Sequence, residues 1–584
     1  MAAALLWREG RALIRGRPVD KTEALTPGLT LYRSGSMELR GKGRGAAVRS
    51  TAWATNGMVC CAQPLAAVAG IDILKAGGSA VDAAIATNAC LGVMEPTSCG
   101  LGGDLFAIVW DPKSVGLNGL NASGRAPLAI DIDKVPPTEE GTIPLHSPYA
   151  WSTPGCAEGW FALHARYGRS PLEQVLAPAI GYARNGFPLS PVIANEWYWG
   201  AELHREKAGF ADVFMRGGKA PEEGGLFANP VLAQTLTEVA AKGATFTRTG
   251  RFAEAIVAYS QANGGFFGME DFATNEPTWV EPVSSNYRGY DVWELPPNGQ
   301  GIAALQMLNI METFDLRELG RESADYWHVL VEAKKLAYAD RARFYTDPAF
   351  ANVPVEGLIS KDYARPRAGL IDMERAACEL PYGDPAALNR RETTYLCAAD
   401  RDGMMVSLIQ SNYTGFGSGY AVPELGIGLQ NRGNLFALDP EHPNRLEPGK
   451  RPFQTIIPAF ITKDAEPLIA FGLMGGDMQP QGHAQVVANL VDFDMNLQEA
   501  GDAARFRHTH DSEPTGTLMH DGGSLRLESG VSEGIVEDLR KRGHTIDEQG
   551  TAQYGGYQAI YRDQAAGVYA GATERRKDGV ALGY

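Results

Sequence analysis

The sequence predicts a mixed α/β protein whose strands concentrate in its C-terminal third. Helix start and stop signals separate Ala- and Leu-rich segments through residues 62–344. From residue 393 to about 482, short apolar runs alternate with Gly-rich turns, which is typical of strands. Apolar residues make up 44% and charged residues 21% of the chain, as in ordinary soluble globular proteins.

In chain order, the first predicted helix covers 62–76 and ends at Gly77-Gly78. Ser79 and Asp82 form a capping box for a second helix over 80–94. A Gly-rich loop and a strand over 105–110 follow. Capping residues and terminal glycines predict further helices over 170–185, 229–242, 323–344, 484–493 and 530–542, and the segment 557–570 is strand-like.

Several function classes are excluded by motif order or composition. The Gly-rich loop 98–104 follows a helix and precedes a strand, the reverse of a dinucleotide fingerprint. There is neither a Walker A motif nor a Gly-x-Ser-x-Gly elbow. A formal charge of -16 argues against a nucleic-acid partner, since phosphate binding requires clustered Lys and Arg.

The chain is predicted to be cytoplasmic and not bound to a membrane. Its seven Cys are unevenly spaced, which predicts buried thiols in a reducing compartment. The N-terminus carries charge where a secretory signal would be apolar, and no uninterrupted apolar stretch is long enough to cross a bilayer. Residues 1–55 are interpreted as an irregular extension.

The segment 392–418 is where the sequence places the chemistry. Two β-like runs flank Asp400-Arg401-Asp402-Gly403, which predicts a hairpin. Thr393 either simply opens a strand or becomes a new N-terminus after self-cleavage. In the second case its freed α-amino group, with a pKa of ~7.7–8.0, serves as the base, so no catalytic triad is required. Gly475-Gly476 could aim two N–H groups at an oxyanion, although such a pair alone is more often a turn.

No metal or other cofactor is predicted. His508, His510 and Asp511 lie together, but no second cluster stands at ligand spacing, so an exposed loop is the favoured interpretation. His328 and His483 stand alone in the sequence and are interpreted as structural histidines.

An ordered set of motifs resembles the γ-glutamyltransferase family of N-terminal nucleophile hydrolases, and most closely its glutathione hydrolase-like amidohydrolase branch. The resemblance covers roughly residues 56–584. The matching stretches are 76–86, 95–104, 121–127, 296–301, 339–341 with 347–348, 416–419, 426–431, 450–452, 472–477, 504–506 and 583–584.

The resemblance implies a four-layer αββα sandwich and a precursor that cuts itself between Glu392 and Thr393. Residues 56–392 would form a large subunit and residues 393–584 a small one that stays associated with it. By the same resemblance, Thr393 is the nucleophile and Ser411 hydrogen-bonds it, while Gly475 and Gly476 form the oxyanion hole.

The implied substrate pocket departs from that of glutamate-handling members. Ser123 stands where they carry an Arg for the α-carboxylate, and Leu435 stands where they carry an Asp for the α-amino group. Arg432 replaces a Gln, and Gln454-Thr455 replaces a Ser-Ser pair. Because a buried unpaired ammonium is costly, Leu435 argues against a free α-amino group on the substrate.

Arg125, Arg432 and Arg451 would instead suit an acyl group that carries a carboxylate. The segment 436–450 is also shorter than in lid-bearing members, which predicts a more open cleft. Arg125, Arg432, Gln454 and Thr455 are therefore the predicted substrate-binding residues.

Three functional hypotheses follow. The first is a self-processing amidohydrolase or acyltransferase that cleaves γ-glutamyl or related acyl amides through a Thr acyl-enzyme. The second keeps this chemistry but acts on dicarboxylic monoamides of the glutaryl or oxamate type, with little glutathione activity. The third is an uncleaved, non-catalytic binding protein.

Overall fold

Two seven-stranded antiparallel sheets form the centre of the computed structural model, which describes residues 37, 39, 47–385, 396–548 and 554–584. These residues belong to one unit, Gly35–Tyr584. One sheet has the strand order β1-β19-β18-β15-β14-β9-β8. Its strands are β1 (Ala52–Ala54), β8 (Val283–Tyr287), β9 (Tyr290–Glu294), β14 (Ala459–Lys463), β15 (Glu466–Met474), β18 (Gly556–Asp563) and β19 (Val568–Thr573).

The other sheet has the order β20-β2-β10-β11-β3-β4-β7. Its strands are β2 (Met58–Cys61), β3 (Asp104–Asp111), β4 (Gly116–Ala122), β7 (Thr278–Val280), β10 (Leu396–Ala399), β11 (Met405–Ser411) and β20 (Val580–Gly583). Of the fourteen described strands in the two sheets, seven precede residue 393. Residues 393–584, one third of the chain, therefore supply half of these strands, as predicted, and several of them pair with N-terminal strands over long sequence distances.

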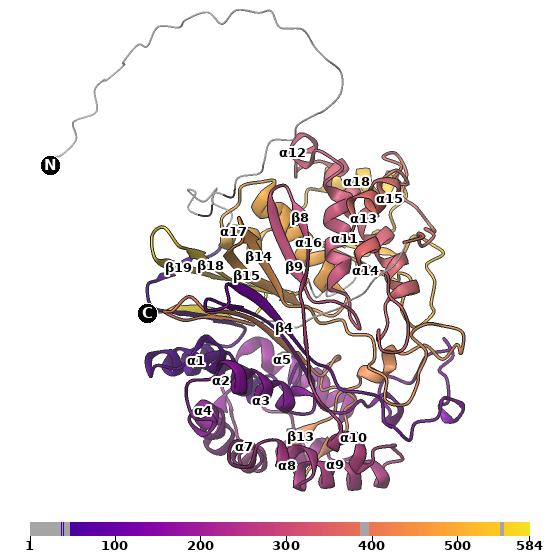
Figure 1. Ribbon diagram of the computed structural model, residues 1–584. Coiled ribbons are helices and arrows are strands. Elements are labelled where there is room, and N and C mark those ends of the chain that lie inside the picture. The colour runs from indigo at the N-terminus through magenta and orange to yellow at the C-terminus, as the bar shows by residue number, and fades with distance from the viewer. Residues whose placement is uncertain (1–36, 38, 40–46, 386–395, 549–553) are drawn as a thin grey trace, which may run out of the picture. The chain divides into compact units, whose positions relative to one another are not determined.

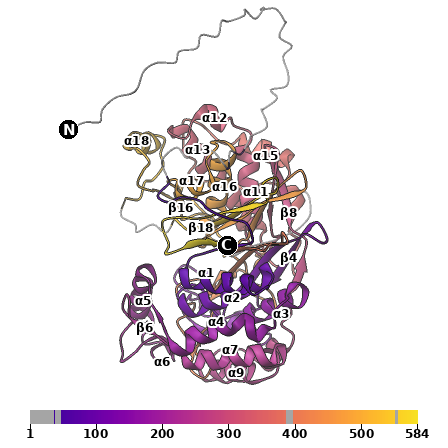
Figure 2. The same ribbon diagram turned by 90° about the vertical axis from the view of Figure 1, so that its left-hand side faces the viewer.

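The two sheets pack face to face, and helices cover both outer faces. Apolar side chains from both sheets, among them Met58, Phe106, Phe460 and Ile560, form the core between them. Figures 1 and 2 show α1 to α4 against one sheet, and α11, α13 and α16 against the other. This arrangement confirms the four-layer αββα sandwich.

The outer helical layers have these bounds. On the side of the β2–β11 sheet are α1 (Pro64–Lys75), α2 (Ala80–Met94), α3 (Cys156–Tyr167), α4 (Leu172–Asn185), α5 (Pro191–His204), α6 (Phe210–Phe214), α7 (Pro230–Lys242), α8 (Ala244–Arg248) and α9 (Arg251–Ala262), of which α7 packs on α4. On the side of the other sheet are α11 (Gly301–Met311), α13 (Ala324–Phe344), α15 (Lys361–Ala368), α16 (Met478–Val491), α17 (Leu497–Asp502) and α18 (Glu533–Lys541), of which α15 packs on α11 and α18 on α13.

Local signals set several of these helices as predicted. The Ser79 side chain accepts a hydrogen bond from Asp82 N, and the Asp82 carboxylate accepts one from Ser79 N, which begins α2 at Ala80. The segment predicted as one strand over 557–570 is instead the pair β18 and β19, with Gly567 at a φ of 66° in the turn between them. In the described part of the chain, no helix is both long and apolar enough to span a membrane.

Candidate active site

The hairpin β10–β11 brings Ser411 to the edge of the candidate site. Leu396 pairs with Leu408 in this hairpin, and Ser411, at the end of β11, pairs with Asp104 of β3. Ser411 is only 7% exposed, and its Oγ accepts a 2.8 Å hydrogen bond from Tyr413 N. Glu392 and Thr393 lie outside the described residues.

Tyr413 itself has a φ of 79°, a left-handed conformation that an aromatic residue rarely adopts. Such backbone strain gathers at functional sites, where the surrounding structure holds it in place. Here the Ser411 hydroxyl supplies one of the contacts that hold it.

A second turn, Gly475–Gly476, joins β15 to α16. Both residues have positive φ, 127° and 60°. A Cβ on Gly475 would lie 3.1 Å from Gly555 Cα, so this position requires glycine. Gln300 Nε2 donates to the carbonyl oxygen of Gly476 at 3.1 Å and also to that of Thr455.

Arg432 lies in the 3-10 turn Arg432–Leu435 and is 0% exposed. Its Nη1 donates to Thr455 Oγ1 at 2.7 Å, and its guanidinium lies 4.6 Å from the centre of the Tyr413 ring. The predicted residues Ser411, Arg432, Thr455 and Gly476 are therefore linked to one another through Tyr413 and Gln300.

Gln454 and Asp104 continue this network. Gln454 Nε2 donates to Asp104 and, at 3.0 Å, to Ser123 Oγ. Asp104 also accepts from Gly124 N at 2.8 Å and from Gln430 Nε2 at 2.9 Å. Burial dominates over these hydrogen bonds and over the nearby Arg432, and it raises the pKa of Asp104 to about 6.

Arg125 reaches this network indirectly, through Asp347, which accepts a 2.8 Å hydrogen bond from Arg451 N. Arg125 Nη1 donates to Gly449 O at 3.0 Å and lies 3.7 Å from Asp347 Oδ2. Arg451 is closer to the pocket, since its Nε donates to Ser123 O at 3.0 Å. Leu435 packs in the apolar core. The position where glutamate-handling members carry an Asp therefore offers no charge.

Sequence reasoning assigned no role to Arg341, which the structure places directly beneath the Gly475–Gly476 turn. Arg341 Nη1 donates to Gln300 Oε1 at 2.7 Å and to Asp477 Oδ1 at 2.6 Å. Its Nη2 donates to Glu513 Oε2 at 2.7 Å. The available signal was that three of the ordered motifs, 296–301, 339–341 and 472–477, each contribute one of these residues.

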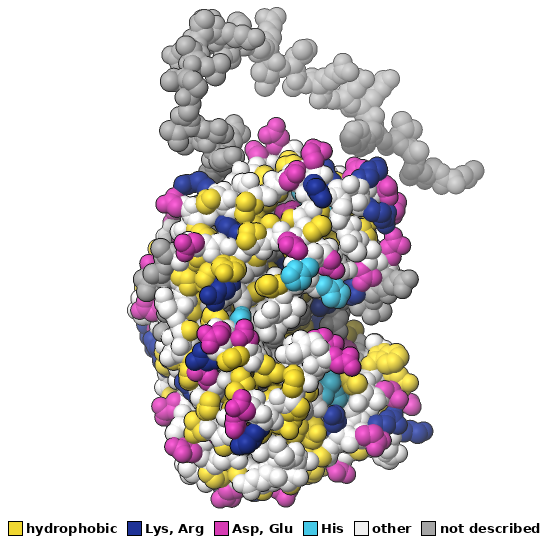
Figure 3. Space-filling view, turned by 90° about the vertical axis from the view of Figure 1, so that its right-hand side faces the viewer, with side chains coloured by type: hydrophobic (Ala, Val, Ile, Leu, Met, Phe, Trp, Pro, Cys, Tyr) yellow, Lys and Arg dark blue, Asp and Glu magenta, His cyan; other side chains and the backbone are white. Residues whose placement is uncertain are grey.

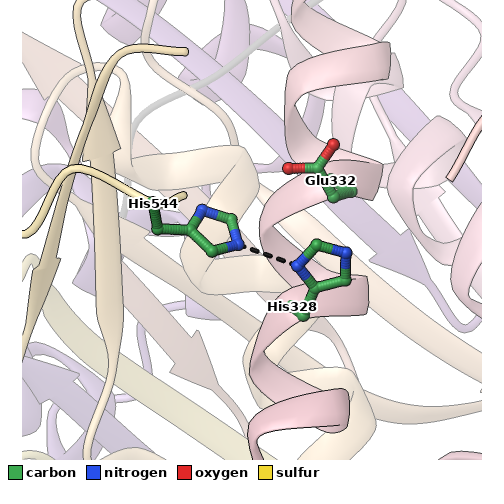
Figure 4. Close-up of side chains that lie close together, drawn as sticks. All are labelled: His328, Glu332 and His544. Atoms are coloured by element: carbon green, nitrogen blue, oxygen red, sulfur yellow. Dashed lines mark hydrogen bonds between the residues drawn. The ribbon is translucent and has the colours of Figure 1, made fainter. Parts of the chain in front are cut away.

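Among the residues that the structure describes, one cluster has the composition of a metal site, namely His328, Glu332 and His544 (Figure 4). His328 is isolated in the sequence but packs beside His544 in the fold, and both of its ring nitrogens have partners, as expected of a structural histidine. Its Nε2 lies 2.9 Å from Asp372 O and carries the hydrogen, so Nδ1 accepts from His544 Nε2 at 2.8 Å. Lys335 Nζ donates to Glu332 at 2.8 Å. Because these contacts occupy the ligand atoms and add a cation, the cluster fits a hydrogen-bonded pair of neutral imidazoles better than a metal site.

His508 and Asp511 were predicted to lie in an exposed loop, and this is wrong. Both are buried, with His508 Nδ1 2.9 Å from Asp511 Oδ1. Lys334 of α13 donates to Asp511 and supplies its counter-charge. His483 is a structural histidine, as predicted, since Leu473 N donates to its Nε2 at 3.1 Å and its Nδ1 lies 2.7 Å from Glu294.

One face of the molecule lacks the clustered Lys and Arg that a nucleic-acid-binding surface needs. Figure 3 shows Lys and Arg side chains scattered among Asp and Glu on the face that it presents, with no continuous basic patch.

Comparison with known proteins assigns the family. The family model for gamma-glutamyltranspeptidase matches residues 66–584. The glutathione hydrolase-like YwrD proenzyme of Bacillus subtilis is 37% identical, over 91% of this chain and 98% of the relative. The oxamate amidohydrolase proenzyme of Klebsiella pneumoniae is 32% identical, over 91% and 99%. The crystal structure of cephalosporin acylase from Bacillus halodurans is similar with a TM-score of 0.84 and 43% identity, covering 92% of this chain and 97% of that one. The chain therefore belongs to the gamma-glutamyltranspeptidase family, whose members include glutathione hydrolases, acylases and amidohydrolases.

Proposed function

We propose that this protein is a self-processing amidohydrolase or acyltransferase that cleaves γ-glutamyl or related acyl amide bonds through Thr393. One observation carries the proposal. Leu396 lies opposite Leu408, and Ser411 follows Leu408 by three residues. Thr393 precedes Leu396 by the same three residues in sequence. An antiparallel ladder continued in this register would bring the Thr393 hydroxyl to Ser411, beside Asp104.

In the proposed reaction, the Thr393 oxygen attacks the amide carbonyl carbon. Its proton passes to the freed α-amino group of Thr393 and then to the leaving amine as the C–N bond breaks. The result is an acyl ester on Thr393 and a free amine. Water, or an acceptor amine, then attacks the ester and restores the hydroxyl group. The N–H groups of Gly475 and Gly476 would stabilise the oxyanion in both steps.

In the first cleavage, the Thr393 hydroxyl would attack the carbonyl carbon of Glu392. The Glu392–Thr393 C–N bond would break, the hydroxyl proton would pass to the leaving nitrogen, and water would then hydrolyse the ester formed on the Thr393 oxygen. The leaving nitrogen is the α-amino group of Thr393, so it becomes available as a base only after this cut. This step would divide the precursor into a large part, 56–392, and a small part, 393–584. The two parts would stay together, because β10 and β11 of the small part lie between β2 and β3 of the large part in one sheet. The proenzyme names of the relatives support such a precursor.

Within this reaction class we favour an acyl group that ends in a carboxylate, as in glutaryl or oxamate-type amides. Leu435 offers no partner to a substrate ammonium, and Ser123 is bound by Gln454 and Asn298. Arg432 supplies a buried cation beside Ser411 and Thr455. The names of the oxamate amidohydrolase and cephalosporin acylase relatives fit this preference.

A substrate panel tests the choice between the two candidate functions. Turnover of γ-glutamyl, glutaryl and oxalyl amides would be compared for the purified wild-type chain and a Thr393→Ala variant. We expect hydrolysis of glutaryl or oxalyl amides to exceed that of the γ-glutamyl amide, and Thr393→Ala to abolish it. Efficient γ-glutamyl turnover would contradict the proposed preference for a carboxylate-bearing acyl group. An active Thr393→Ala enzyme would contradict the assignment of Thr393 as the nucleophile.

A further inference from the structure

The α13 helix places a buried cation beneath the Gly475–Gly476 turn. Arg341 is 0% exposed, although burying an unpaired guanidinium would be strongly unfavourable. Asp477 and Glu513 neutralise it, and their side chains remain 36% and 29% exposed. The charge is therefore retained at a place where an apolar side chain would fill the same space without needing partners.

The contacts of Arg341 meet the C-terminal end of the turn in two ways. Its Nη1 bridges Gln300 Oε1 at 2.7 Å and Asp477 Oδ1 at 2.6 Å. Gln300, oriented in this way, donates its Nε2 to Gly476 O at 3.1 Å. Tyr338, on the same helix, donates its hydroxyl to Asp477 O. The Gly476 carbonyl is thus held by Gln300, which Arg341 orients, and Asp477 is held directly by Arg341 and Tyr338 of α13.

Such fixing matters because glycine has no Cβ to restrict its backbone. The direction of a glycine N–H depends on the planar peptide groups around it and on what holds them. Hydrogen-bond donors accelerate a reaction when they already point to where the oxyanion will form.

We propose that Arg341 is a positioning residue that holds the Gly475–Gly476 turn in the geometry an oxyanion hole requires. It does so through its hydrogen bonds to Gln300 and Asp477. The inference rests on the proposed function, in which this turn stabilises the oxyanion. Arg341 does not touch the reacting atoms. It acts on kcat through the turn and leaves substrate binding largely unchanged.

The chain offers a matched control in Arg367 of α15. Arg367 is 4% exposed, donates to Leu336 O and Pro381 O at 2.9 and 2.7 Å, and lies 3.1 Å from Asp340. It is the same kind of buried cation but makes no contact with the turn. An effect that arises only from removing a buried guanidinium should appear equally in Arg367→Met.

The test compares full-length Arg341→Met, Arg341→Lys, Asp477→Asn and Arg367→Met with the wild type. Hydrogen–deuterium exchange of peptides covering residues 473–479 reports the order of the turn directly, and steady-state kinetics on the best panel substrate report catalysis. We expect Arg341→Met and Asp477→Asn to raise exchange there and to lower kcat about 10- to 100-fold, with KM within about twofold. Arg341→Lys should fall between them and the wild type, because an ammonium cannot span the same partners.

Unchanged exchange at 473–479 in folded Asp477→Asn would overturn the proposal, and so would an equal kcat loss in Arg367→Met. The Asp477 side chain is partly exposed, so Asp477→Asn should fold even if Arg341→Met does not, and it then tests the proposal by itself. A wild-type chain that hydrolyses no panel amide would instead refute the proposed function, while the exchange comparison would still show whether Arg341 orders the turn.

Discussion

Arg432 should decide which acyl groups the enzyme accepts. Its guanidinium is held by Thr455 Oγ1 at 2.7 Å and faces the Tyr413 ring at 4.6 Å, so it is already oriented before a substrate binds. A charge-assisted hydrogen bond to a substrate carboxylate is worth about 1.5–3 kcal/mol. Since each 1.36 kcal/mol is a factor of ten, Arg432→Met should lower kcat/KM about 10- to 150-fold for an acyl group with a terminal carboxylate.

The assay uses two anilides of equal acyl length, glutaryl anilide and valeryl anilide, of which only the first carries a carboxylate. Arg432→Met should lower kcat/KM for the glutaryl substrate and leave the valeryl value within about threefold. Arg432→Lys should retain part of the preference. Thermal melting of each variant controls for folding, because Arg432 is wholly buried.

Two results would refute this reasoning. An equal loss of kcat/KM on both anilides would show that Arg432 supports the pocket structurally and does not bind the substrate carboxylate. A loss of glutaryl preference in Arg125→Met alone would assign the contact to Arg125, whose side chain is 33% exposed.

Two further predictions concern the same site. Gly475 has a φ of 127°, and an added Cβ would lie 3.1 Å from Gly555 Cα, whereas Gly476 has a φ of 60° and open space around an added Cβ. Gly475→Ala should therefore lower kcat far more than Gly476→Ala. Equal kcat values in the two variants would contradict the role of the turn. Burial raises the pKa of Asp104 from 3.8 to about 6, so between these pH values the folded state binds more protons than the unfolded state. The free energy of unfolding should therefore fall by up to about 3 kcal/mol as pH rises through this window. Chemical denaturation of wild type and Asp104→Asn across pH 4–7 measures this slope, which should be shallower in the variant; identical slopes would contradict the assignment.

Local signals in the sequence were sufficient for much of the helical structure. The start of α2 follows from Ser79 and Asp82, which lie three residues apart and cap each other. The hairpin β10–β11 follows from an Asp/Gly turn between two apolar runs. The four-layer arrangement rested on the ordered motifs, because the pairing of β10 with β2 joins residues more than 300 positions apart and leaves no local pattern.

The candidate site shows the same limit. Arg341 meets Gln300, Asp477 and Glu513 across 41, 136 and 172 residues, so no spacing rule reveals their contact. His508 and Asp511 looked like an exposed polar loop because their counter-charge, Lys334, lies more than 170 positions away on α13. These two residues are buried because a helix that is distant in the sequence supplies their partner.

The central claim is that Thr393 is both the site of self-cleavage and the nucleophile. The most direct measurement is the intact mass spectrum of the purified wild-type chain and of Thr393→Ala, recorded under denaturing conditions. We predict two wild-type masses, one for a fragment that ends at Glu392 and one for the fragment 393–584, and a single full-length mass for the variant. A wild-type chain that stays whole on incubation, or a variant cut at the same bond, would contradict the account.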